Sequence, residues 1–131
     1  EAPVTIALFT DTDLAKRARK IARVAGVRNF SDEQLQFYMQ NLPAEFARYS
    51  EQQKSDYLAL NAGLVAMNLV LALTDQGIGS NIILGFDKSK VNEVLEIDGR
   101  FRPELLITVG YTDEKLEPSY RLPVDEIIEK R

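Results

Sequence analysis

The pattern of apolar and polar positions divides the chain into short apolar runs separated by longer segments with helical periodicity. Val4–Phe9 is apolar on both faces apart from Thr5, which predicts an internal strand. Ser80–Leu84 is predicted as a second strand, and Leu105–Val109 as a third that ends at Gly110. Long helical segments between few strands favour an α+β fold.

The first predicted helix begins after the cap formed by residues 11–13, and Gly26 is placed to stop it. Its apolar stripe has the spacing i, i+4, i+7 and i+11: Leu14, Ala18, Ile21 and Ala25. Its other face is basic: Lys16, Arg17, Arg19, Lys20 and Arg23.

This basic face has two interpretations, a contact with nucleic acid or phosphate and an ordinary solvated surface. The next predicted helix opens with Asp32 and Glu33, which would repel a phosphate backbone. The formal net charge of −4 also lacks the basic surplus of a typical nucleic-acid binder. We therefore predict a solvated face and no nucleic-acid partner.

Ser31–Gln34 has the pattern of a capping box and predicts the start of a second helix. Pro43 is expected to end or bend it, with a helical continuation to Tyr49. This segment is rich in aromatic residues, which are predicted as core or cover, with a ligand channel as the alternative. They are Phe30, Phe37, Tyr38, Phe46 and Tyr49.

Tyr57–Thr74 contains no charged residue and is long enough for a membrane span. Asn61, Asn68 and Thr74 interrupt it, and Lys54 is the only basic residue near its ends. We therefore predict no membrane span but a helix buried all round, in a core or a subunit interface.

The C-terminal half predicts two shorter helices. Asp87 is expected to cap a helix whose apolar face holds Val91, Val94 and Leu95. Residues 115–120 are expected to be extended, and Pro123 to precede a terminal helix over residues 124–129. No repeat or linker is visible, so residues 1–131 are predicted to form a single domain.

Composition narrows the chemistry. The 131 residues include no Cys and no His, which excludes thiol nucleophiles, zinc–thiolate sites and histidine bases. No acidic cluster suggests a metal site, so we predict neither metal nor catalytic side chains. If the protein is an enzyme, a bound cofactor is expected to supply the reactive group. The lack of Cys suits a cytoplasmic location.

Gly77-Ile78-Gly79 does not fit a dinucleotide fingerprint, because position 82 is Ile and a helix precedes the glycines. The passage through Gly85 is the better candidate for a ligand site. Main-chain N–H groups of Leu84 and Gly85 could donate to a flat ligand, because glycine allows close approach. Ile82 and Ile83 could supply an apolar wall. A plain strand-to-helix connection is the alternative.

Several motifs in order resemble the flavin-dependent nitroreductase family over the whole chain. They are Asn61-Ala62-Gly63 with Asn68-Leu69, Gly77-x-Gly79-Ser80, Gly85-Phe86-Asp87 with Val91, Gly110-Tyr111, and Arg121-x-Pro123. The resemblance implies a nitroreductase-like, mixed and largely antiparallel sheet flanked by helices. It also implies that the long uncharged helix lies in the interface of an intertwined homodimer.

The resemblance further implies FMN bound between subunits. Hydride would pass from NAD(P)H through flavin N5 to a nitroaromatic, quinone or similar small acceptor, in a ping-pong reaction. Carried over by position, Ile82, Ile83, Leu84 and Gly85 would contact the flavin ring. Arg121 would reach the FMN phosphate, and Ser119 stands where some relatives have Lys.

Two departures from the family pattern matter. Leu84 stands where some relatives have an acidic residue, and nothing matches the family's N-terminal Arg-Ser-Arg-like segment. Glu1 is followed almost at once by an apolar strand, so we expect the native product to carry a further N-terminal part. A non-catalytic dimeric scaffold or flavin-binding module with the same fold is the alternative function.

Overall fold

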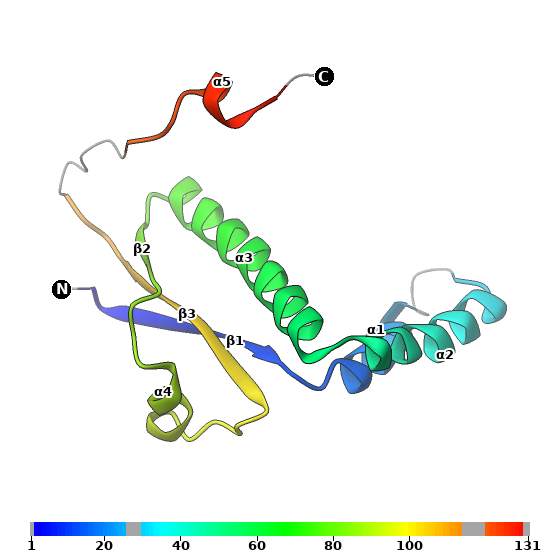
Figure 1. Cartoon of the computed structure of the whole chain (residues 1–131). Coiled ribbons are helices and arrows are strands. Elements are labelled where there is room, and N and C mark those ends of the chain that lie inside the picture. Colours follow the sequence, from blue (N-terminus) through cyan, green and yellow to red (C-terminus); the bar gives the residue numbers. More distant parts are fainter. Residues whose placement is uncertain (1, 26–29, 114–119, 130–131) are drawn as a thin grey trace.

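A computed structural model describes residues 2–25, 30–113 and 120–129. A three-stranded antiparallel sheet lies at its centre, in the order β1 (Val4–Asp11), β3 (Phe101–Gly110), β2 (Gly79–Ile83). The long helix α3 (Glu51–Asp75) crosses one face of the sheet, and the short helix α4 (Lys88–Val94) lies near the opposite end of β2 from α3 (Figure 1). The α+β prediction is confirmed.

The main core forms between α3 and one face of the sheet. Ile107 at the middle of β3 is fully buried and packs with Leu105, Val109 and Ala66 of α3. The central strand is therefore β3. The strand predicted as internal, β1, is an edge strand among the described residues, because its register pairs it only with β3.

A bulge interrupts the pairing of β1 with β3. Leu8 pairs with Leu105 and Phe9 with Pro103, so Glu104 is the extra residue on β3. Pro103 is tolerated here because the ladder to β2 reaches β3 only from Leu106 onward. The bulge lets β3 begin earlier than the predicted Leu105.

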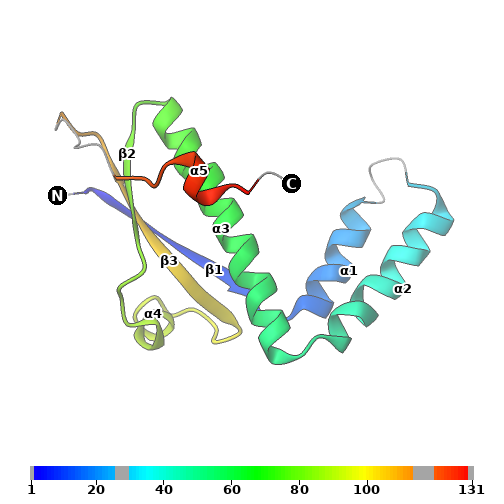
Figure 2. The same ribbon diagram turned by 45° about the horizontal axis from the view of Figure 1, so that its top comes forward.

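Helices α1 (Leu14–Ala25) and α2 (Asp32–Arg48) form an antiparallel hairpin that projects from the sheet (Figure 2). The predicted capping box is confirmed, since the Gln34 N–H donates to Ser31 Oγ at 3.2 Å and the Ser31 N–H to Gln34 Oε1 at 3.0 Å. Pro43 lies inside α2 and does not end it. Leu14, Ala18, Phe46 and Leu58 form the small core at the base of the hairpin.

A second capping box, between Ser50 and Gln53, starts α3. Only one face of this helix is buried, and it carries Leu58, Ala62 and Ala66. On the opposite face lies an exposed apolar ridge, made of Leu60, Leu64, Met67 and Leu71. A helix buried all round in the core is therefore wrong for a single chain, and burial in a subunit interface stays a prediction.

By length and composition, α3 is also the one helix in the described residues that could cross a membrane. This is weak evidence, because core helices of soluble proteins pass the same test. Its Ala66 packs against Leu105, Ile107 and Val109 of β3.

The C-terminal segment carries one helical turn, α5 (Val124–Ile127), which is shorter than the predicted helix. Residues 120–129 lie beyond the C-terminal end of α3, away from α4 (Figure 1). Most of the passage predicted as extended, residues 115–120, falls outside the described residues.

Candidate functional site

The candidate site is the connection between β2 and α4. The ladder of β2 ends at Ile83, which pairs with Leu106 of β3. Asp87 then caps α4, accepting hydrogen bonds from the Ser89 N–H at 3.0 Å and the Ser89 hydroxyl at 2.6 Å. The Ser89 hydroxyl is the main cause that lowers the pKa of Asp87. The carboxylate of Asp87 is therefore engaged with the start of α4.

Two consecutive peptide N–H groups in this loop are available to a ligand. No acceptor among the described residues pairs with the N–H of Leu84 or Gly85, whereas the Phe86 N–H donates to the Leu84 carbonyl at 3.1 Å. A Cβ built on Gly85 would meet nothing within 4 Å, and Leu84 is 66% exposed. The loop therefore offers paired donors beside open space.

Ile82 and Ile83 do not form a single wall. Successive strand residues point to opposite faces of a sheet. Ile82 pairs with Ile107 and so shares the face covered by α3, while Ile83 pairs with Leu106 on the other face. A ligand on one side of β2 would meet only one of these two side chains, and the other could contribute only through its backbone.

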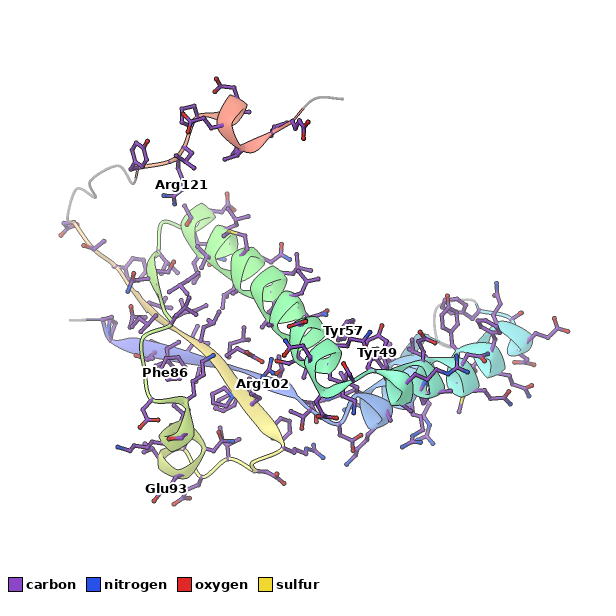
Figure 3. The ribbon with its side chains drawn as sticks, viewed as in Figure 1. Tyr49, Tyr57, Phe86, Glu93, Arg102 and Arg121 are labelled. Atoms are coloured by element: carbon purple, nitrogen blue, oxygen red, sulfur yellow. The ribbon has the colours of Figure 1, made fainter. Side chains whose placement is uncertain are left out.

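Arg121 does not approach this loop within one chain. It lies near the C-terminal end of α3, far along β2 from Phe86 (Figure 3). Its side chain is exposed, and its Nη1 donates to the Tyr120 carbonyl at 2.8 Å. Ser119 lies outside the described residues. Within one chain, the loop residues predicted to contact the flavin ring are therefore far from Arg121, which is predicted to contact the phosphate.

An apolar cavity of about 290 Å³ lies on the same sheet face as Ile83. Its walls come from β1, β3 and α4: Thr5, Ala7, Leu106, Lys90, Val91, Val94 and Leu95. The apolar face of α4 was predicted from the sequence, but the cavity was not, since its lining comes from three elements far apart in the chain.

A buried polar cluster at the base of the sheet also escaped prediction. Glu104 is buried beside the guanidinium of Arg102, whose Nε donates to Glu104 Oε1 at 2.7 Å. Arg102 Nη1 also donates to Ser55 Oγ of α3 at 2.7 Å. The cluster connects α3 to the bulged part of β3.

A second carboxylate, Asp11, joins the sheet to the hairpin. Arg17 Nε donates to Asp11 Oδ2 at 2.7 Å, and Arg100 Nη2 lies 3.6 Å from the same oxygen. Burial would raise the pKa of Asp11. The Asp13 N–H, Arg17 and Arg100 outweigh that effect, so the pKa is lowered. No group of three or more acidic side chains in the described ranges could hold a metal ion.

Comparison with known proteins identifies the family to which this chain belongs. The family model "Nitroreductase family" matches residues 2–111, so the chain belongs to the nitroreductase family. The Streptococcus pyogenes protein Spy0809, provisionally named an NAD(P)H nitroreductase, is 66% identical over all 131 residues. The chain spans 65% of that relative's length.

Solved structures agree with this family. The crystal structure of a nitroreductase family protein from Streptococcus pneumoniae matches with a TM-score of 0.93 and 92% identity, over 100% of this chain and 66% of that one. A structure from Exiguobacterium sibiricum, described as a nitroreductase in complex with FMN, matches with a TM-score of 0.89 at 22% identity, over 99% of this chain and 63% of that one. At that identity the second match supports the fold alone.

Proposed function

We propose that this chain is part of an FMN-dependent oxidoreductase that uses NAD(P)H to reduce a small acceptor such as a nitroaromatic or a quinone. The observation that carries the proposal is the pair of unengaged N–H groups at Leu84 and Gly85. FMN, when bound, would supply hydride transfer between the nicotinamide and the acceptor. Membership in the nitroreductase family and the FMN complex of a similar fold support it.

The chain's own residues would bind and orient the flavin. The Leu84 and Gly85 amides would donate to the redox-active edge of the ring, and the missing Cβ of Gly85 would let a planar group approach the backbone. Leu84 would cover the ring with an isobutyl group, which excludes water without adding charge. No side chain acts as acid or base in this proposal.

The proposed enzyme is a homodimer. The apolar ridge of α3 leaves Leu60, Leu64 and Leu71 each at least 59% exposed, which is unusual for the middle of a long helix unless another surface covers it. The partner subunit would bury this ridge. Arg121 is far from the β2–α4 loop of its own chain (Figure 3). In the dimer, Arg121 of one subunit would bind the FMN phosphate at the site of the other subunit.

Flavin titration of the complete purified protein tests the proposal. A flavin absorption band that stays with the protein through gel filtration, and bleaches with NADH or NADPH without oxygen, is the expected result. A parallel titration with riboflavin separates ring contacts from phosphate contacts, because riboflavin has the ring but no phosphate. Protein that binds neither flavin would contradict the proposal.

The second candidate is a dimeric scaffold or flavin-binding module without turnover. The absence of His and Cys gives it some support, since no acid, base or nucleophile of those types is present. A bound flavin that NADH and NADPH both fail to reduce, while dithionite reduces it, would favour this candidate.

For the proposed oxidoreductase we propose a cytoplasmic location, because its use of NAD(P)H suits that compartment.

A further inference from the structure

We infer that Leu84 is a specificity-determining residue, which keeps the acceptor site free of negative charge. Neutral and anionic aromatic acceptors are then preferred to cationic ones. This role of Leu84 rests on the proposed function, in which the β2–α4 loop contacts the flavin. It adds the electrical charge of the acceptor to that function, and it follows from the position of Leu84 and from the charges around it.

The side chain of Leu84 lies close to any atom that its own N–H group binds. This N–H has no acceptor among the described residues. A hydrogen bond would hold an acceptor atom about 2.9 Å from the Leu84 nitrogen, and the Cβ of the same residue is about 2.5 Å from that nitrogen. The Cβ would therefore lie within about 5.4 Å of the bound atom. With the flavin edge at this amide, the side chain at position 84 stands beside the reacting atoms.

The exposure of Leu84 matters because of its place in the loop. A single exposed leucine is common on protein surfaces, so its 66% exposure alone would indicate nothing. Here the leucine lies beside two unengaged peptide donors and next to Gly85, where an added Cβ would meet nothing within 4 Å. An isobutyl group at that place gives a planar aromatic molecule an apolar surface to pack against, without adding charge.

The charges in residues 84–92 include no unpaired carboxylate. Asp87 is the only acidic residue in this range. Its Oδ1 accepts hydrogen bonds from Ser89, and its Oδ2 lies 3.5 Å from Lys90 Nζ. Lys88 is exposed and forms no ion pair with any residue that the structure describes. The loop therefore presents amide donors and a lysine to a ligand, but no free negative charge.

This absence of negative charge suits an acceptor that becomes more negative as it is reduced. A nitro group that takes up two electrons and two protons, supplied by NAD(P)H and H⁺, becomes a nitroso group and releases water. A quinone that takes up the same electrons and protons becomes a hydroquinone. Negative charge grows on the oxygen atoms of the acceptor as the electrons arrive, and N–H donors stabilise it whereas a nearby carboxylate would oppose it. Leucine at position 84 avoids that repulsion and offers no anion that would hold a cationic acceptor.

Four forms of the complete protein loaded with FMN test this role: the parent, Leu84→Glu, Leu84→Gln and Leu84→Lys. Leu84→Gln is the matched control, because glutamine has the size of glutamate without its charge. Two unreactive aromatic ligands of opposite charge, benzoate and benzyltrimethylammonium, are titrated into each form. The change in the flavin absorption spectrum gives each dissociation constant, so this measurement does not depend on turnover.

In the parent protein, benzoate should bind more tightly than benzyltrimethylammonium. Leu84→Glu should change the ratio of the two dissociation constants by at least about tenfold in favour of the cation, because a charge so close to the ligand is weakly screened. Leu84→Lys should change the ratio in the opposite direction, and Leu84→Gln should leave it within about twofold of the parent value. The kcat/KM values for para-nitrobenzoate and para-nitrobenzyltrimethylammonium should follow the same order.

Two outcomes would overturn the role of Leu84. One is a ratio that stays within about twofold of the parent value in both charged variants, and the other is tighter binding of the cation than of benzoate by the parent. Either result leaves the proposed function in place if NAD(P)H still bleaches the bound flavin. Failure of the parent to bind FMN would remove the proposed function, and the role of Leu84 with it. If Leu84→Glu loses FMN, the comparison of Leu84→Lys with Leu84→Gln decides.

Discussion

Thr10 and Glu104 meet across the bulge that joins β1 to β3, where the Thr10 hydroxyl donates to Glu104 Oε1 at 2.5 Å. The same oxygen also accepts from Arg102 Nε at 2.7 Å. Glu104 is 7% exposed, so its carboxylate depends on these two donors rather than on water. The bulge is therefore a place where one side chain connects two strands and, through Arg102, helix α3.

Glu104→Gln should lower the free energy of unfolding by about 2–3 kcal/mol, because it leaves the partly buried Arg102 without its counter-charge. Urea unfolding followed by circular dichroism measures the change. Glu45→Gln is the matched control. Its ion pair with Arg48 spans 3.7 Å between exposed side chains, and its loss should cost less than about 0.5 kcal/mol. Equal changes in the free energy of unfolding for the two substitutions would show that the buried cluster stabilises the fold no more than an exposed ion pair does.

The lowered pKa of Asp11 predicts that the stability of the protein depends on pH. Its folded-state pKa lies below the ordinary value of 3.8, so Asp11 stabilises the folded state at pH values above 3.8. This stabilisation is lost as the pH falls through the folded pKa. Stability should therefore drop on acidification below about pH 4, and Asp11→Asn should flatten this part of the curve while lowering stability at neutral pH. Thermal unfolding between about pH 2 and pH 7 measures it. Parallel curves for the two proteins would contradict the prediction.

Gly85→Ala should separate ligand binding from folding. A Cβ there meets nothing within 4 Å in the folded chain, so the Tm should change by no more than about 2 °C. The same methyl group would stand between the backbone and a flavin ring, and FMN affinity should fall at least about tenfold. Gly99→Ala is the control, since it too has open space around the added Cβ. FMN affinity unchanged in Gly85→Ala would remove this loop from the flavin site.

Leu64→Asp should convert the proposed dimer into monomers. Leu64 lies in the apolar ridge of α3 and is 60% exposed in one chain, so the substitution disturbs little within the protomer. A carboxylate buried in a subunit interface is costly, and the dimer dissociation constant should rise by at least about 100-fold. Light scattering after gel filtration gives the mass. Gln40→Asp, on an exposed position of α2, should leave the mass unchanged. A monomeric parent protein would refute the proposed dimer.

Local signals predicted much of the fold. The Ser31 capping box and the Asp87 cap each depend on residues within one or two turns, and each is confirmed. The predicted apolar stripe of α1 is buried at Leu14 and Ala18, whereas Ile21 is 58% exposed. The Ser50 box has the same S-x-x-Q pattern and could have been predicted from it. The position of β1 at the sheet edge could not be predicted, because the apolar sequence of a strand does not determine which strands pair with it.

The candidate site followed the same division. The residues Leu84 and Gly85 could be singled out from a strand, a glycine and a cap in sequence order. The opposite orientation of Ile82 and Ile83 follows from strand alternation and was available from the sequence once β2 was assigned. The separation of Arg121 from the loop, and the contact of Arg102 with Ser55, depend on long-range packing that spacing along the chain does not encode.

The α1–α2 hairpin meets the rest of the protein mainly at its base, through the packing of Phe46 with Leu58 and the contact of Arg17 with Asp11. A rigid arm held at one end magnifies any rotation at that end into a larger travel at the other. Small adjustments around Asp11 would therefore displace the Phe37 and Tyr38 rings much farther than the atoms that cause them, so this junction governs where the aromatic end of the arm can reach.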